Sequence, residues 1–299
     1  MAALLAFARP HTIIGTVLAV VGLWAMAGAW AAGAPAAAGV GALVLALVAA
    51  LATNVYIVGI NQLTDVDIDR INKPFLPLAA ERISMRTGRV WVATAGVLAI
   101  LAAATAGRYL LAAVAIGLLV GTAYSVRPFR LKRFHVAAAA SITSVRALTV
   151  NLLVYAHFQH VIDGSAAVPR HVLALTGMVL GLTIAIAWFK DIPDAIGDAR
   201  HGIATLVLRL GVRRVLAAGL VVLGACYVSL IVAGLVGLAG VNSTVLVVGH
   251  LGLLAGLVVI TRRTDLTDTE SLRSFYSNIW RLFFIEYLVF PLAAVAAVR

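Results

Sequence analysis

The sequence of 299 residues is poor in charge, since Asp, Glu, Lys and Arg together make up only 12% of it. That is about half the share found in ordinary soluble domains. Hydrophobic residues make up 63%, and 26 glycines add to the non-polar share. A soluble protein of this composition has too few polar side chains to cover its surface. The composition therefore excludes a soluble fold and predicts an integral membrane protein.

Cysteine is nearly absent, because Cys226 is the single one and lies within an apolar run. One cysteine excludes an internal disulfide and a metal site built from several thiolates. The first apolar stretch, residues 12–32, is longer than the apolar core of a signal peptide. We therefore expect it to be retained as the first membrane helix.

Acidic residues are also scarce, with 12 Asp and Glu against 23 Lys and Arg and a formal net charge of +11. In a membrane protein such an excess is typical of basic cytoplasmic loops, so we expect no nucleic-acid partner. Nothing indicates an obligate protein partner. Half of the acidic residues fall into two short windows, 65–69 and 191–198. This clustering is the most informative feature of the sequence.

Apolar runs of spanning length predict an all-α integral membrane fold in which residues 1–299 form one domain of nine helices. The two termini would then lie on opposite sides of the bilayer. The predicted spans are 12–32, 37–60, 90–107, 109–126, 135–156, 171–189, 214–236, 243–261 and 279–298.

The basic residues divide unequally between the two sides of this arrangement. One side would carry nineteen Lys and Arg and the other only Arg108, Arg170 and Arg299. The positive-inside rule then predicts that the amino terminus and both acidic windows are cytoplasmic. We expect a multi-pass protein of a bacterial cell membrane.

The first window places oxygen ligands at a helical spacing. Asn61, Asp65 and Asp69 would share one face if the helix continued through them. Three such ligands suit Mg²⁺, which prefers a few carboxylates together with water and phosphate oxygens. An EF-hand loop starting at Asp65 is excluded, because Arg70 and Leu76 stand where Gly and Glu are needed.

The second window repeats the pattern, with Asp191, Asp194 and Asp198 at i, i+3 and i+7. Pro193 and Gly197 leave a regular helix uncertain there. Two facing stripes of carboxylates would repel each other, and bound divalent cations would relieve this repulsion. The windows therefore predict a Mg²⁺–diphosphate clamp rather than a solvated polar face. The basic residues beside them that would add charge stabilisation are Arg70, Lys73, Lys190 and Arg200.

The spacings Asn61-x₃-Asp65-x₃-Asp69 and Asp191-x₂-Asp194-x₃-Asp198 resemble the paired motifs of the UbiA superfamily of intramembrane aromatic prenyltransferases. The likeness is greatest to the homogentisate prenyltransferase branch of tocopherol and plastoquinone synthesis, and it fades after about residue 202. The segment "LAAERIS" after Pro77 departs from that branch and leaves the acceptor open. The similar segments are "RPHTIIGT" (9–16), "NQLTDVDIDRINKPFLPLA" (61–79), "GTAYSVRPFRLKRF" (121–134) and "KDIPDAIGD" (190–198).

The resemblance implies two Mg²⁺ ions, an isoprenyl diphosphate donor and an aromatic acceptor. One ion would be held by the Asn61, Asp65 and Asp69 set and the other by Asp191, Asp194 and Asp198. Tyr124 and Ser125 would lie beside the reacting centre. The implied diphosphate ligands are Arg9, Lys73, Arg127, Arg130, Lys132 and Lys190.

Arg146 stands midway along the fifth predicted helix. A charge at that depth costs roughly 2.5–3.5 kcal/mol on insertion scales, so it should face the bundle interior. Two interpretations remain open: Arg146 binds the acceptor or the diphosphate, or it forms a structural pair with Glu286 of the ninth helix.

These observations predict Mg²⁺-dependent C-prenylation of a homogentisate-like phenol inside the membrane. A terpene cyclase on the same scaffold is the alternative, because it needs the same clamp and replaces the phenol by a double bond of its own substrate. A transporter fits less well, since transport sites lie near the bilayer midplane and these acids lie at helix ends.

Overall fold

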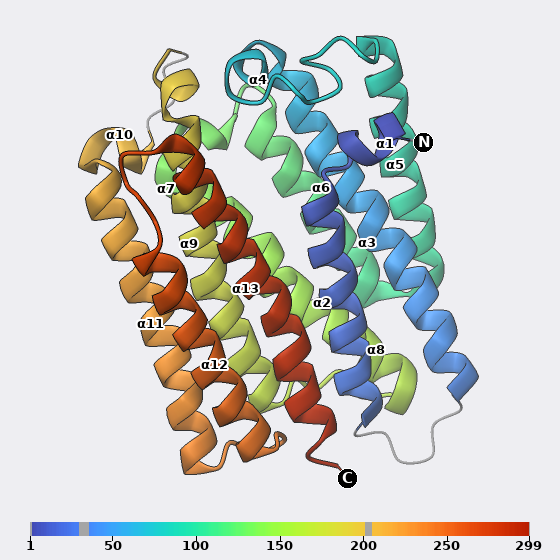
Figure 1. Ribbon diagram of the computed structural model, residues 1–299. Helices are drawn as coiled ribbons and strands as arrows, with labels where there is room; N and C mark the ends of the chain where they lie inside the picture. Colours follow the sequence, from blue (N-terminus) through green and yellow to red (C-terminus); the bar gives the residue numbers. More distant parts are fainter. Residues whose placement is uncertain (1, 30–35, 201–204, 299) are drawn as a thin grey trace.

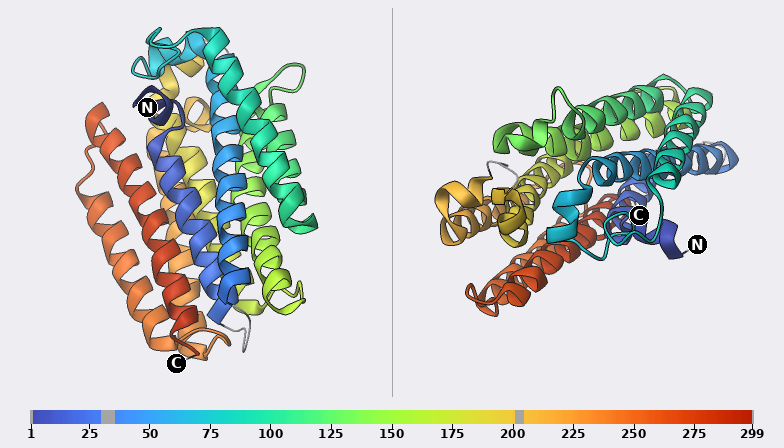
Figure 2. Two further views of the ribbon diagram at one scale, coloured as in Figure 1. Left: turned by 90° about the vertical axis from the view of Figure 1, so that its right-hand side faces the viewer. Right: turned by 90° about the horizontal axis from the view of Figure 1, so that it is seen from above.

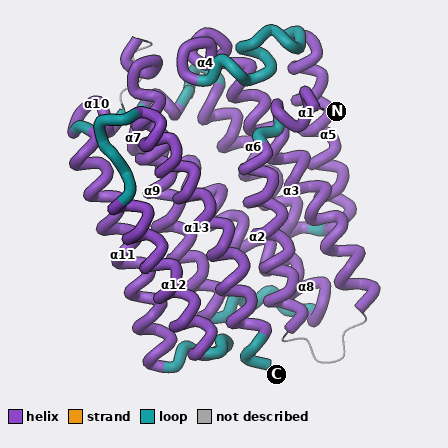
Figure 3. Tube along the Cα trace, in the orientation of Figure 1, coloured by secondary structure: helices purple, strands orange, loops and turns teal. Residues whose placement is uncertain are grey.

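The computed structural model describes residues 2–29, 36–200 and 205–298, and for 2, 36–38 and 194–200 it describes the helical backbone only. Within these ranges every regular element is a helix (Figure 3). The all-α fold is therefore confirmed. Nine of the described helical segments are long and apolar enough to cross a membrane, which confirms the predicted number.

Eight spans are single helices, and the fifth is built from three consecutive segments, α7, η2 and α8. Four short helices lie between spans. The spans are α2 (Pro10–Ala29), α3 (Ala36–Thr64), α5 (Met85–Ala106), α6 (Arg108–Ser125), α7 (His135–Thr143) with η2 (Ser144–Val154) and α8 (Tyr155–Asp163), α9 (Arg170–Arg200), α11 (Val212–Val236), α12 (Ser243–Arg262) and α13 (Thr269–Val295); the short helices are α1 (Ala2–Phe7), α4 (Val66–Asn72), η1 (Leu131–Arg133) and α10 (Leu206–Leu210).

Several predicted boundaries are wrong because helices extend beyond their apolar part; the fifth span, for example, ends at Asp163 and not at 156. The ninth span begins at Thr269 and not at 279, since Asp268 caps it by accepting the backbone N–H groups of Glu270 and Ser271. The sixth continues as a helix through Pro193 to Arg200. Hydropathy alone detects the apolar part of a helix and not its polar end.

The short helices gather at one end of the bundle. Figure 1 shows α1, α4 and α10 at that end and α8 at the other. The left view of Figure 2 shows the spans running along the bundle from the side, and the right view looks down on the α4 end. Helix α13 packs against α2, α9 and α12, whereas α3 packs against α2, α5 and α6. The helices before residue 135 and the helices after it thus surround one common bundle interior.

The middle of the fifth span is π-helical, which the prediction of a regular helix over 135–156 did not include. Segment η2 covers Ser144–Val154, and Thr149 Oγ1 donates a hydrogen bond to the Ser144 carbonyl five residues earlier at 2.8 Å. Segments of π-helix often occur at functional sites. Arg146 lies within this one.

Candidate active site

Asp65 interrupts the helix that carries the first acidic window. Helix α3 ends at Thr64 and α4 begins at Val66. The prediction of one continuous helix through Asp69 is therefore wrong, because the single residue Asp65 breaks it. Asp65 has φ −121° and ψ 17°, and its carbonyl accepts the Asp69 N–H at 2.7 Å. Aspartate is favoured at such helix starts. The carboxylates of Asp65 and Asp69 nevertheless line the same cavity as Asn61.

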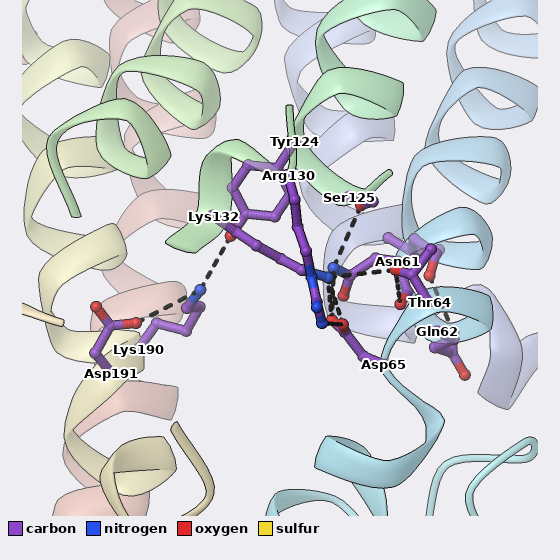
Figure 4. A network of polar contacts seen from close by, with 11 residues as sticks. Asn61, Gln62, Thr64, Asp65, Tyr124, Ser125, Arg130, Lys132, Lys190 and Asp191 are labelled. Atoms are coloured by element: carbon purple, nitrogen blue, oxygen red, sulfur yellow. Dashed lines mark hydrogen bonds and ion pairs between the residues drawn. The ribbon is translucent and has the colours of Figure 1, made fainter. Parts of the chain in front are cut away.

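Asp65 is 8% exposed, and its carboxylate is surrounded by donors from α3 and from residues 130–132 (Figure 4). Lys132 Nζ lies 2.5 Å from each of its oxygens, and Arg130 Nη2 lies 3.3 Å from Oδ1. Asn61 Nδ2 donates to Oδ2 at 3.1 Å. Charge-assisted contacts of this kind are strong when desolvated. One carboxylate thus meets two cations, and the local charge is positive.

Lys132 reaches Asp65 because the short helix η1 turns its side chain inward. Arg130, the residue just before η1, has a left-handed φ of 39°. Lys132 is 8% exposed and also donates to Thr64 Oγ1 at 3.3 Å. Burial lowers the pKa of Lys132, and the adjacent Asp65 charge partly offsets this effect.

The second window approaches from helix α9. The Asp191 side chain is 14% exposed, and its Oδ1 lies 3.5 Å from Lys190 Nζ. Lys190 also donates to the Tyr124 hydroxyl at 3.2 Å, which links α9 to the end of α6 (Figure 4). Asp194 and Asp198 belong to the same helix, but their side chains lie outside the described residues.

A cavity of about 520 Å³, here called the polar cavity, lies between the two windows. Asn61, Asp65, Asp69 and Asp191 line it, so the structure brings the described acids of both windows together. Five basic residues share its described walls with the three acids, which favours an anionic ligand. These basic residues are Arg9, Lys73, Lys132, Lys190 and Arg273.

Besides Arg146, which is described below, four predicted site residues lie outside the described lining of this cavity. Arg70 is half exposed and pairs with Asp67 at 3.3 Å and Glu81 at 2.7 Å, and none of these three residues lines the polar cavity. Arg127 is exposed in the loop after α6. Ser125 is buried with its Oγ 3.5 Å from Asn61 Nδ2, and Arg130 contacts the site through Asp65.

A second cavity, here called the apolar cavity, has a volume of about 280 Å³ and extends along the bundle. Its walls are mostly aliphatic and aromatic side chains. Several residues line both cavities, so the two meet end to end. The shared residues include Arg9, His11, Asn61, Tyr124, Lys190 and Tyr276.

Arg146 lines the apolar cavity and stacks on aromatic rings of α13. Its Cζ lies 4.6 Å from the centroid of the Trp280 ring and 5.6 Å from that of Phe283. The predicted alternative of a pair with Glu286 is wrong, because Glu286 Oε1 lies 3.2 Å from His250 Nε2 of α12. Arg146 has no ion-pair partner among the described residues.

Sequence reasoning missed the contribution of α13. Arg273 lines the polar cavity, Tyr276 both cavities and Trp280 the apolar one. The three lie at i, i+3 and i+7, a spacing that places them on one helical face. That spacing could have revealed them, but it lies where the resemblance to known motifs has faded.

The UbiA prenyltransferase family model matches residues 7–285. Homogentisate phytyltransferase of Synechocystis sp. is 43% identical over 288 residues, which cover 96% of this chain and 94% of the relative. Homogentisate phytyltransferase 1 of Arabidopsis thaliana is 37% identical, over 95% of this chain and 73% of the relative. Homogentisate solanesyltransferase of the same plant is 35% identical, over 95% and 75%.

Solved structures agree with the fold. A UbiA homolog from Archaeoglobus fulgidus bound to GPP and Mg²⁺ superposes with a TM-score of 0.67 at 19% identity, covering 98% of this chain and 99% of that one. Digeranylgeranylglyceryl phosphate synthase gives 0.67 at 16% identity, covering 99% and 98%. Since the family model spans nearly the whole chain and relatives above 30% identity cover it, this chain belongs to the UbiA prenyltransferase family.

Proposed function

We propose that this membrane prenyltransferase joins an isoprenyl group to a ring carbon of a homogentisate-like phenol. Its family and its homogentisate-using relatives support prenyl transfer to an aromatic acceptor. The observation that carries the proposal is the meeting of two cavities, one rich in acids and bases and one apolar. A diphosphate head fits the first and an isoprenyl tail the second.

The described donor set fits Mg²⁺, because Asn61, Asp65, Asp69 and Asp191 present only oxygen and amide groups to one cavity. We propose two ions, one at Asn61, Asp65 and Asp69 and the other at Asp191 with Asp194 and Asp198. When bound, Mg²⁺ would neutralise the diphosphate and make it a better leaving group.

The basic residues of the polar cavity would hold the phosphate oxygens. Lys73, Lys190 and Arg9 line the cavity directly, and Tyr124 orients the Lys190 ammonium through its hydroxyl. Lys132 now contacts Asp65, and it can exchange that carboxylate for a phosphate oxygen. Such preorganised cations stabilise the negative charge that develops as the C–O bond of the donor breaks.

The acceptor would lie against the α13 side of the apolar cavity. Arg146 lines this cavity but is not among the described residues of the polar one, so we assign it to the acceptor carboxylate rather than to the diphosphate. The Trp280 and Phe283 rings would pack on the phenol. The apolar walls exclude water, which would otherwise capture the allylic cation.

In the reaction, the C–O bond between the allylic carbon and the diphosphate breaks, and the electron-rich ring forms a C–C bond to that carbon. The attacked ring carbon then loses its proton, which restores aromaticity, and the released diphosphate can accept that proton. We further propose that residues 1–299 are one domain in a bacterial cell membrane, with the acidic windows on the cytoplasmic side. The excess of Lys and Arg at that end supports this orientation.

The test is product formation by the purified chain in lipid vesicles with MgCl₂, geranylgeranyl diphosphate and homogentisate. We expect a prenylated phenol by mass spectrometry and none when either substrate is omitted. A cyclised hydrocarbon or alcohol formed without any phenol would overturn the proposal in favour of a terpene cyclase.

A further inference from the structure

We infer that Tyr287, held in place by Asn151, binds a ring hydroxyl of the aromatic acceptor while Arg146 binds its carboxylate. The inference rests on the proposed function, since it takes the acceptor to lie against α13. It adds a second point of recognition to the acceptor site. Two points of contact would fix how the ring is turned toward the donor.

The π-helical segment η2 turns two polar side chains toward α13. Arg146 and Asn151 are five residues apart within this segment. The hydrogen bonds of a π-helix join residues five apart, so these two positions lie about one turn apart on a similar face. An α-helix of 3.6 residues per turn would point them about 140° apart. The change of helix type therefore lets one short segment present both groups to the same neighbour.

Three aromatic side chains of α13 meet these two groups. Trp280, Phe283 and Tyr287 lie at i, i+3 and i+7 on one face of the helix, and all three line the apolar cavity. Arg146 stacks on the first two rings. The Phe283 and Tyr287 rings pack edge to face with their centroids 5.2 Å apart. The Tyr287 hydroxyl donates a hydrogen bond to Asn151 Oδ1 at 2.6 Å, which fixes the far end of that side chain.

The hydrogen bond to Asn151 determines what Tyr287 can recognise. Because its one proton is engaged, the Tyr287 oxygen can only accept a further hydrogen bond. A phenol hydroxyl supplies the donor that this oxygen needs, and a carboxylate does not. Tyr287 and Arg146 also interact electrostatically, so the two groups act on one region of the cavity. Homogentisate carries both a carboxylate and ring hydroxyls and therefore suits the pair.

The test uses ortho- and meta-hydroxyphenylacetate, which keep the carboxylate of homogentisate and each lack one of its two hydroxyls. Each analogue competes with homogentisate in vesicles with MgCl₂ and geranylgeranyl diphosphate, so that its Ki reports binding whatever its reactivity. For wild type we expect one analogue to have a Ki about tenfold above the KM of homogentisate, the usual effect of a lost buried hydrogen bond. Equal constants for all three compounds would overturn the inference. Failure to prenylate homogentisate at all would instead contradict the proposed function.

Tyr287→Phe removes the hydroxyl and keeps the ring. We expect the KM of homogentisate to rise about tenfold while the Ki of the weaker analogue stays unchanged, so that the ratio of the two constants falls to about one. The matched control is Tyr227→Phe, because Tyr227 of α11 is equally buried and is not among the described residues that line either cavity. This control should keep the wild-type ratio. A wild-type ratio in an active Tyr287→Phe variant would overturn the inference.

Asn151→Leu tests the positioning role of Asn151, which is 0% exposed and is not among the described lining residues of either cavity. It frees the Tyr287 proton, so we expect the same ratio to fall at least threefold. Added to Tyr287→Phe, it should change the KM of homogentisate less than twofold, since Asn151 acts through that hydroxyl. The double variant removes both polar partners together, which is nearly neutral for stability, so it remains usable if a single variant does not fold. An unchanged ratio in Asn151→Leu, or a larger change in the double variant, would refute the assignment of Asn151.

Discussion

Asp65 and Glu286 are two buried carboxylates of this bundle, 8% and 0% exposed, and each contacts a basic side chain. Glu286 meets His250 where α12 packs against α13, and it lines neither the polar nor the apolar cavity. Asp65 meets Lys132 and Arg130 at the wall of the polar cavity, among more basic than acidic residues.

The difference shows that burial and a basic partner do not by themselves identify a site. The contact between Glu286 and His250 joins α13 to α12, and removal of His250 would leave a buried carboxylate without its basic partner. Asp65 differs because its surroundings contain an excess of cations and a space of about 520 Å³. Asp65 should therefore matter for turnover, and Glu286 for the stability of the fold.

Asp65→Asn is expected to have the largest effect, because it removes the charge that would bind a metal ion while it keeps the shape of the side chain. We expect kcat/KM to fall by about 10³-fold, a typical loss when a charge-stabilising group is removed. Prenylated product is measured in vesicles containing equal amounts of folded protein. If the variant keeps activity within tenfold of wild type, Asp65 does not bind the metal–diphosphate.

Lys132→Met should weaken turnover by about 10²-fold, because the diphosphate loses a buried cation. The matched control is Arg70→Met, since Arg70 is half exposed and pairs with Asp67 and Glu81 outside the cavity. We expect that control to stay within about twofold, as is usual for exposed ion pairs. Equal losses in both variants would contradict the assignment of the diphosphate to the polar cavity.

Arg146→Met tests the cation of the apolar cavity. A hydrogen bond to a charged group contributes about 1.5–3 kcal/mol, so KM for homogentisate should rise about 10- to 100-fold. The KM of a phenol that lacks the carboxylate should hardly change. An equal rise for both acceptors would show that Arg146 does not recognise the carboxylate.

Glu286→Gln should have the smallest effect on turnover and a clear one on stability. The charge-assisted contact with His250 becomes a neutral one, which costs about 1–2 kcal/mol. We expect a lower Tm in detergent and, per folded molecule, activity within about twofold of wild type. A variant with unchanged Tm but lost activity would show that Glu286 acts in turnover and not in the stability of the fold.

The amino-acid sequence predicted the nine spans because apolar length is a property of composition. It also placed Asp65, Asp69 and Asp191 at one site, from their spacing and from the family resemblance. The break at Asp65 and the π-helical turns from Ser144 to Val154 were not predictable, because hydropathy does not distinguish one helical hydrogen-bonding pattern from another.

Long-range partners were the other limit. Lys132 contacts Asp65 across 67 positions, and His250 contacts Glu286 across 36. From the sequence, Arg146 was the one partner considered for Glu286, as one of two interpretations of Arg146. Only the packing of α12 against α13 shows which base faces the carboxylate.

The most direct test of the central claim is a Mg²⁺ titration of prenyl transfer by wild type, Asp65→Asn and Glu286→Gln in identical vesicles. We predict that wild type and Glu286→Gln respond to Mg²⁺ alike and that excess chelator abolishes their activity, while Asp65→Asn stays inactive at every concentration. Wild-type product in excess chelator, or a wild-type titration curve from Asp65→Asn, would contradict the claim that the acidic windows bind the metal–diphosphate.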